Sequence, residues 1–236
     1  MATKKERGGV IDQEAAERLL RRYLDERGWQ YEWERREFGG KKPDAVILSE
    51  SGEPIAVIDA VPVAEGAQLS EAIQEHLARR AEQASPVAEA GLPYLLAAHI
   101  PGCPPLERIA PLIIENLRQF PAISAFGILR ELGVAVVKKY TEFAKQHPRN
   151  PPLPTPTLTV MEMLLNPCTR VAWREGLWGA TDEVWGWVEN LQEFQTVHDG
   201  RWWGLYRLFS LAGSVSAPFK EGVKMSRSEN FYEERE

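Results

Sequence analysis

Two short apolar runs, each carrying an acidic residue, do most to limit how this chain can fold. The first covers residues 44–48 and opens with Asp44, and the second covers residues 54–63 and carries Asp59 near its end. A short segment containing a glycine separates them, and apolar runs around such a turn predict a β-hairpin. A carboxylate inside a buried strand costs free energy unless it is paired or metal-bound. We therefore expect Asp59 to be a functional residue.

The segments on either side of this hairpin predict an α/β fold. Apolar residues recur at helical spacing over residues 12–27 and again over residues 67–90. Partial alternation over residues 29–38 and a continuous apolar run over residues 94–100 predict strands. The expected order is α-β-β-β-α-β, in a mixed sheet flanked by helices. Pro86 lies within the second helix, where a proline predicts a break or a kink.

The second half of the chain changes in composition. Residues 106–119 and 122–132 predict further helices. Five prolines within residues 147–157 are typical of a stiff linker, and six of the eight tryptophans lie beyond it, between Trp173 and Trp203. We expect a Trp-rich, mainly helical C-terminal region, with a helix from residue 181 to about 195 and a strand over 201–209. The predicted divisions are a flexible leader (1–10), an α/β domain (11–146), the linker (147–157), the Trp-rich region (158–214) and a charged tail (215–236).

Composition limits the setting and the partners of the chain. It has 236 residues and a net charge of −6, so nucleic-acid binding would need a local basic patch. Cys103 and Cys168 form no CxxC pair, which argues against a disulfide framework and fits a reducing cytoplasm. No apolar run approaches the ~20 residues of a membrane helix, and the charged N-terminus does not read as a secretion signal. We expect a cytoplasmic protein with no membrane partner.

The hairpin also predicts a metal site. Adjacent strands can bring Asp44 and Asp59 close together, and two carboxylates make a hard oxygen site for Mg²⁺ or Mn²⁺. Such a metal would polarise a phosphate and lower the pKa of a bound water. If the chain is an enzyme, this chemistry predicts a metal-dependent phosphodiesterase.

The same stretch resembles a known superfamily. The matching motifs are Gly28-Trp29, Lys42-Pro43-Asp44, Gly52-Glu53-Pro54 and the apolar strand that ends in Ile58-Asp59-Ala60. In this order they resemble the PD-(D/E)XK nucleases, and within them the N-terminal domain of Type I restriction-enzyme motor subunits. The resemblance covers about 90 residues and implies a restriction-endonuclease-like core. It also implies a helix acid, Glu17 or Glu14, as a third member of the site.

One departure from this pattern limits the expected chemistry. Val61 stands where the family has a lysine that positions the attacking water and neutralises charge on the phosphate. Valine can do neither, and losing a preorganised cation costs orders of magnitude in rate. Asp59 also replaces the more common glutamate. Lys41 and Lys42, or Arg79 and Arg80 on the following helix, could supply a relocated cation.

The basic residues near the motif have two interpretations. Arg21, Arg22, Lys41 and Lys42 could follow a phosphate backbone, or they could be ordinary surface charge. The predicted site is therefore Asp44, Asp59 and Glu17 as catalytic residues, with Asp44 and Asp59 as metal ligands.

Three functions remain open. The first is a degenerate nuclease-like module, with weak or absent activity, that binds a protein or a nucleic acid (DNA in preference to RNA) within a larger assembly. The second is an active Mg²⁺-dependent endonuclease with a relocated cation. The third is a protein-interaction module that uses the Trp-rich region, although those tryptophans could instead form a small core.

Overall fold

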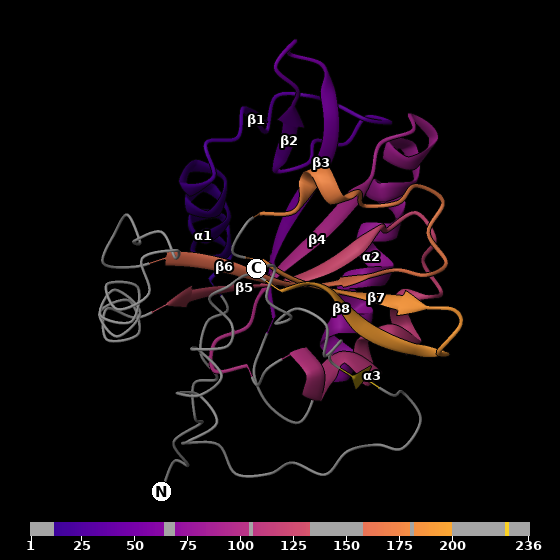
Figure 1. The fold of residues 1–236 in the computed structure, drawn as a ribbon. Coiled ribbons are helices and arrows are strands. Elements are labelled where there is room, and N and C mark those ends of the chain that lie inside the picture. Colours follow the sequence, from indigo (N-terminus) through magenta and orange to yellow (C-terminus); the bar gives the residue numbers. More distant parts are fainter. Residues whose placement is uncertain are drawn as a thin grey trace, which may run out of the picture.

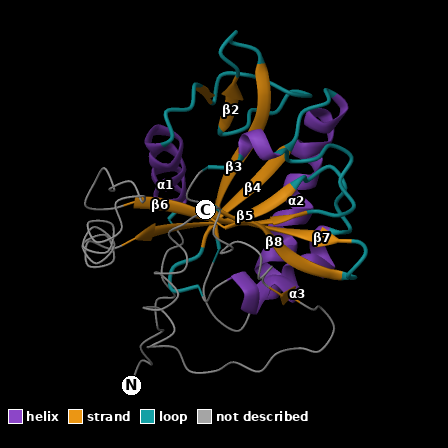
Figure 2. Cartoon of the chain, in the orientation of Figure 1, coloured by secondary structure: helices purple, strands orange, loops and turns teal. Residues whose placement is uncertain are grey.

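The fold is a mixed α/β structure built on one sheet. The computed structural model describes residues 12–63, 69–103, 106–132, 158–179, 182–199 and 225–226. Within these ranges the strands form a nine-stranded sheet in sequential order from β1 to β9. Helix α1 covers one face of the sheet, and α2 and α3 cover the other (Figures 1 and 2). The prediction of a mixed sheet flanked by helices is confirmed.

The first half has the α-β-β-β-α-β order that its hydrophobic pattern predicts. Strands β1, β2 and β3 pair antiparallel, and β4 then pairs parallel with β3. The elements are α1 (Gln13–Glu26), β1 (Tyr31–Trp33), β2 (Ala45–Leu48), β3 (Pro54–Pro62), α2 (Leu69–Glu89) and β4 (Tyr94–His99). The hairpin prediction is confirmed, since Ala45 pairs with Ile58 and Ile47 with Ala56.

Pro86 does not interrupt α2, which continues to Glu89. Proline removes one hydrogen bond of the helix but leaves the helix intact where tertiary packing supports it. Gly39, in the loop between β1 and β2, lies against Pro86. A Cβ added at Gly39 would be only 2.9 Å from the Pro86 ring. Gly39 has a positive φ of 57°, which glycine adopts without strain. This contact brings the loop before Asp44 against α2.

The helix predicted over residues 122–132 is wrong. After α3 (Leu106–Leu117), residues 125–132 form strand β5 (Ala125–Leu132), parallel to β4. Both faces of β5 are buried: Phe126 and Ile128 pack under α2 and α3, and Ala125 and Leu129 under α1. A strand buried on both faces loses its alternation and cannot be told from a helix by periodicity.

The prediction of a mainly helical C-terminal region is also wrong. Its described part contains strands and one short 3₁₀ helix, and residues 183–199 form an antiparallel hairpin. The elements are β6 (Leu158–Leu165), η1 (Glu175–Leu177), β7 (Glu183–Val188), β8 (Glu193–Asp199) and β9 (Met225–Ser226). Aromatic and β-branched residues favour a strand here, and Gln192, with a φ of 53°, ends the turn that reverses the chain.

The sheet runs across the predicted domain boundary. Strand β6, beyond the predicted linker, pairs antiparallel with β5 along its whole length, from Ala125–Leu165 to Leu132–Leu158. Strands from both predicted regions are thus neighbours in one sheet. The leader (1–10), the linker (147–157) and the strand predicted over 201–209 lie outside the described residues, as does the charged tail except for β9.

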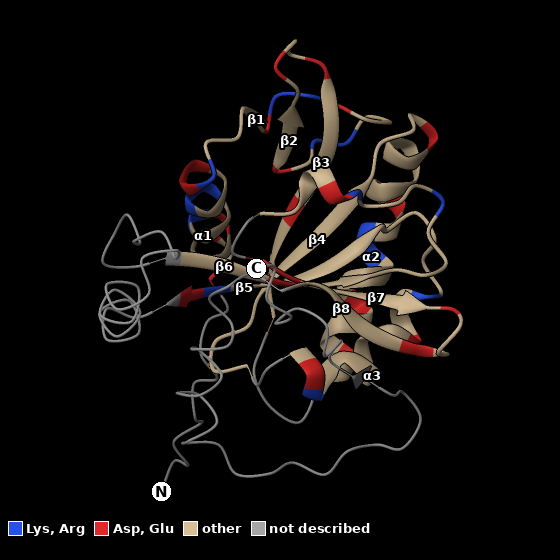
Figure 3. Cartoon of the chain, in the orientation of Figure 1, with Lys and Arg blue, Asp and Glu red and all other residues tan. Residues whose placement is uncertain are grey.

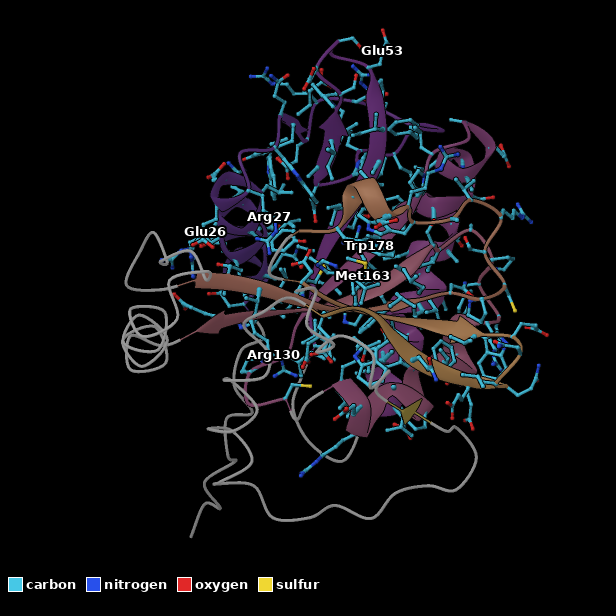
Figure 4. All side chains as sticks on the ribbon, in the orientation of Figure 1. Glu26, Arg27, Glu53, Arg130, Met163 and Trp178 are labelled. Atoms are coloured by element: carbon cyan, nitrogen blue, oxygen red, sulfur yellow. The ribbon has the colours of Figure 1, made fainter. Side chains whose placement is uncertain are left out.

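Two buried ion pairs join segments of the first half of the chain to the second half of the sheet. Arg27, just after α1, bonds to Asp182 at 2.6 Å, and the Tyr23 hydroxyl donates to the same carboxylate at 2.6 Å. Figure 4 labels Arg27 and its neighbour Glu26 at the end of α1, beside β6. On the other face, Arg130 of β5 bonds to Glu162 of β6 at 2.6 Å. Within the described segments, no helix has the length and apolar character to cross a membrane.

Candidate active site

Asp44 and Asp59 meet where strands β2 and β3 separate. The backbone ladder between these strands ends at Ala45 and Ile58. One residue further, the Asp44 amide donates to Oδ1 of Asp59 at 2.8 Å, and the Ala60 amide donates to Oδ2 of Asp44 at 2.7 Å. The two carboxylates therefore take over the role of backbone carbonyls in the ladder. The structure brings together the two acids that the sequence singled out.

Asp59 has two further partners. The Tyr94 hydroxyl of the neighbouring strand β4 donates to Oδ2, and Arg80 of α2 reaches the same oxygen with Nη1 at 3.3 Å. Arg80 also donates to Oε1 of Gln83 at 2.8 Å, and Gln83 Nε2 donates to the carbonyl oxygen of Lys42 at 3.2 Å. Helix α2 is thus bonded both to Asp59 and to the segment that leads into Asp44.

Val61, which replaces the lysine of the resembled motif, brings no cation to the acid pair. Val61 is fully buried in the apolar core beneath α2 and α3. The cation that the structure places at the acid pair is Arg80, which pairs with Asp59. Arg80 is one of the two arginines predicted as a relocated cation. Its side chain is 20% exposed, so the ion pair is largely shielded from water.

Burial raises the pKa of both acids. The pKa of Asp44 rises to about 7, mainly because the carboxyl is buried and next because Asp59 is negative, while the Ala60 amide and Arg80 oppose the rise. The pKa of Asp59 is also raised, again by burial, against the opposing effects of Arg80, Tyr94 and the Asp44 amide. Near neutral pH, Asp44 is therefore partly protonated.

The hydrogen bonds leave little of the pair available to a metal ion. Of the four carboxylate oxygens, Oδ1 and Oδ2 of Asp59 and Oδ2 of Asp44 accept bonds from the protein. In the described part of the chain, no cluster of three or more His, Cys, Asp or Glu side chains could hold a metal. Glu17 lies half-buried on α1 and accepts from Gln13 at 2.9 Å. Its charge raises the pKa of Asp44, but only as the smallest contribution.

The four predicted phosphate-binding residues already have intramolecular contacts. Arg21 stacks on the Trp33 ring at 3.9 Å, and Arg22 pairs with Glu26 and Glu131. Lys41 pairs with Glu82 at 3.1 Å, and Lys42 pairs with Glu37 at 3.4 Å. Figure 3 shows basic and acidic positions interspersed along α1 and around β1 to β3.

Sequence reasoning missed Tyr94 and Gln83 as parts of this site. A tyrosine at the start of a buried strand does carry a signal, because a buried hydroxyl needs a hydrogen-bond partner. The sequence patterns also did not reveal the buried network in which Tyr23 and Arg27 both bond to Asp182, a residue 155 or more positions away in the chain.

Within the described segments, the tryptophans of the C-terminal region serve mainly as core. Trp185 is fully buried and Trp173 is 3% exposed, on opposite faces of the sheet. Trp178 and Trp187 are partly buried against the same two cores. The described tryptophans thus fit the interpretation of the aromatic residues as a hydrophobic core.

Comparison with known proteins gives no relative for this chain. No protein-family model, no curated protein and no solved structure matches it. The function is therefore inferred from the geometry and chemistry of the residues in this structure.

Proposed function

We propose that this chain is a degenerate restriction-endonuclease-like module that binds DNA within a larger assembly and does not cleave it. The observation that carries this proposal is the reciprocal bonding of Asp44 and Asp59. The pair occupies the position that metal ligands would have, but its oxygens accept hydrogen bonds from the protein. The order α1-β1-β2-β3-α2-β4 supports the scaffold.

Three features argue against catalysis. A metal ligand must be deprotonated, and because the pKa of Asp44 is raised to about 7, a metal ion there would compete with a proton near neutral pH. Arg80 lies against Asp59 and repels a cation there. Finally, Val61 leaves the attacking water without the lysine that would position it. The pair is better suited to stabilise the junction of β2, β3 and α2 than to hold Mg²⁺.

The DNA-binding role rests on the cations around this junction. Lys41 and Lys42 are exposed next to Asp44, and Arg79 is exposed beside Arg80. The acid partners of the two lysines are themselves exposed, and such ion pairs are worth about 0–1 kcal/mol. A phosphate can displace partners held that weakly. With a net charge of −6, the binding should be weak and strongly salt-dependent.

One observation favours the active alternative. Arg80 carries its guanidinium to within 3.3 Å of Asp59, so a cation is present although the lysine is not. In a Mg²⁺-dependent endonuclease this arginine would neutralise charge on the phosphate. The alternative requires Arg80 to release Asp59 when a metal enters.

Fluorescence anisotropy with labelled single- and double-stranded DNA and RNA tests the proposal. The double variant Lys41→Gln/Lys42→Gln should weaken DNA binding and reduce the salt slope by about 2. The matched control is Arg118→Gln/Arg170→Gln, which removes the same charge from exposed positions near the end of α3 and after β6. Equal losses in both variants would mean that the lysines have no special role. If neither nucleic acid binds, a protein partner becomes the better explanation.

A further inference from the structure

A half-open cavity of about 430 Å³ lies at the end of β3 that is remote from Asp59. Pro54 and Ile55 open β3, and Asp59 follows Ile55 by four residues, or roughly 13 Å of strand. A volume of this size is typical of small-ligand sites. The cavity is thus separate from the candidate active site.

The walls of the cavity are mostly apolar. They come from the start of β3, the entry to β4 and the η1 segment; the apolar residues are Pro54, Ile55, Leu92, Pro93 and Leu177. Ile55 is 38% exposed and contributes a large aliphatic side chain to the cavity wall. An apolar ligand body covering Ile55 would remove this surface from water.

The same cavity has one cationic residue, Arg174. Among the residues that the structure describes, no acidic side chain pairs with Arg174 and no hydrogen bond engages its guanidinium. Arg27, Arg80 and Arg130 lie largely inside the fold with acid partners, whereas Arg174 is exposed at the mouth of the cavity and open to a ligand. An arginine beside apolar walls can bind a planar carboxylate through two parallel hydrogen bonds.

We propose that this cavity binds a small amphipathic carboxylate, with its apolar body against Ile55 and Leu92 and its carboxylate on Arg174. Charge decides between the anions: a single guanidinium balances a carboxylate, whereas a phosphate dianion needs further donors. This ligand site is independent of the proposed DNA binding, so the failure of one leaves the other standing.

Titrations with octanoate test this site, with octan-1-ol as the uncharged probe and octyl phosphate as the dianionic one. Binding is followed by amide chemical shifts and by calorimetry on the full chain. Arg174→Gln should weaken octanoate binding about tenfold and leave octan-1-ol binding unchanged. Arg170→Gln, an exposed arginine outside the cavity, is the matched control and should have no effect.

A second variant fills the cavity with a side chain instead of removing the charge of Arg174. A Cβ at Gly176, which lines the cavity, would meet no heavy atom within 4 Å, so Gly176→Leu should fold normally. This variant should weaken the binding of both octanoate and octan-1-ol. The inference is overturned if octanoate shifts no backbone amide among Gly91, Leu92 and residues 174–177, if Arg174→Gln binds octanoate as tightly as wild type, or if octyl phosphate binds more tightly than octanoate.

Discussion

The backbone amide of Asp44 donates to the carboxylate of Asp59 at 2.8 Å, one residue beyond the last backbone pair of β2 and β3. The return bond, from the Ala60 amide to Asp44, makes the link reciprocal. Strands β2 and β3 are therefore held together by side chains where their ladder ends. The two acids whose spacing resembles a nuclease motif in the sequence thus hydrogen-bond β2 to β3 in the fold.

The stability of the protein should fall as the pH rises toward neutrality. The pKa of Asp44 is about 7 in the fold, against an ordinary value of 3.8, so its protonated form stabilises the fold below about pH 4. This stabilisation is lost progressively as pH rises through 7, and amounts to about 4 kcal/mol at most. Urea unfolding between pH 5 and pH 8.5 measures it.

Asp44→Asn is the control for this titration. The asparagine oxygen can still accept from the Ala60 amide, but the side chain no longer ionises. His76 and His99 are present in both proteins, so their effects cancel in the difference between wild type and variant. The difference reports Asp44 together with its electrostatic coupling to Asp59. The free energy of unfolding of the variant should therefore increase relative to that of the wild type as pH rises. A constant difference across the pH range would contradict the assigned pKa.

Arg80→Met should destabilise the fold by about 3 kcal/mol, because it leaves Asp59 buried without its cation. Arg79→Met, at the neighbouring exposed position, should cost less than about 0.5 kcal/mol. Adding Asp59→Asn to Arg80→Met should recover part of the loss, since the unpaired charge is then gone. Chemical denaturation of the wild type, Arg80→Met, Asp59→Asn and the double variant gives the coupling energy. Strictly additive effects would show that the ion pair has no energetic role.

Asp182→Asn should also cost about 3 kcal/mol, because it breaks a buried ion pair that joins α1 to the start of β7. Arg22→Met removes a surface arginine of α1 together with its ion pairs to Glu131 and to the less exposed Glu26, and should cost about 1 kcal/mol or less. Since β5 and β6 are neighbours in one sheet, Asp182→Asn should lower the stability of both halves together. Two separate transitions by tryptophan fluorescence and circular dichroism would mean that the halves unfold independently.

Local sequence pattern predicted the first half of the fold and failed in the second. Strand β3 is bounded by a glycine turn and a polar helix, so its limits are visible in the sequence. Strands β5 and β7 are buried on both faces, and Glu183, Val184 and Trp185 are all buried despite pointing to alternate sides. Only pairing with distant strands distinguishes such segments from helices.

The candidate site was predictable in its acids but not in their partners. The hairpin fixes Asp44 opposite Asp59, which makes their meeting a local property of the sequence. Arg80, Gln83 and Tyr94 join them only through the packing of α2 and the parallel pairing of β4. Whether such a pair binds a metal or closes a ladder depends on these contacts.

The most direct test is a DNA cleavage assay with Mg²⁺ or Mn²⁺, run beside calorimetric titration of Mn²⁺ into the metal-free protein. We expect no cleavage above background. We also expect the wild type and Asp44→Asn to give the same Mn²⁺ titration, because the acid pair does not hold the metal. Metal-dependent cleavage by the wild type that disappears in Asp44→Asn would contradict the proposed function and would establish the acid pair as an active site.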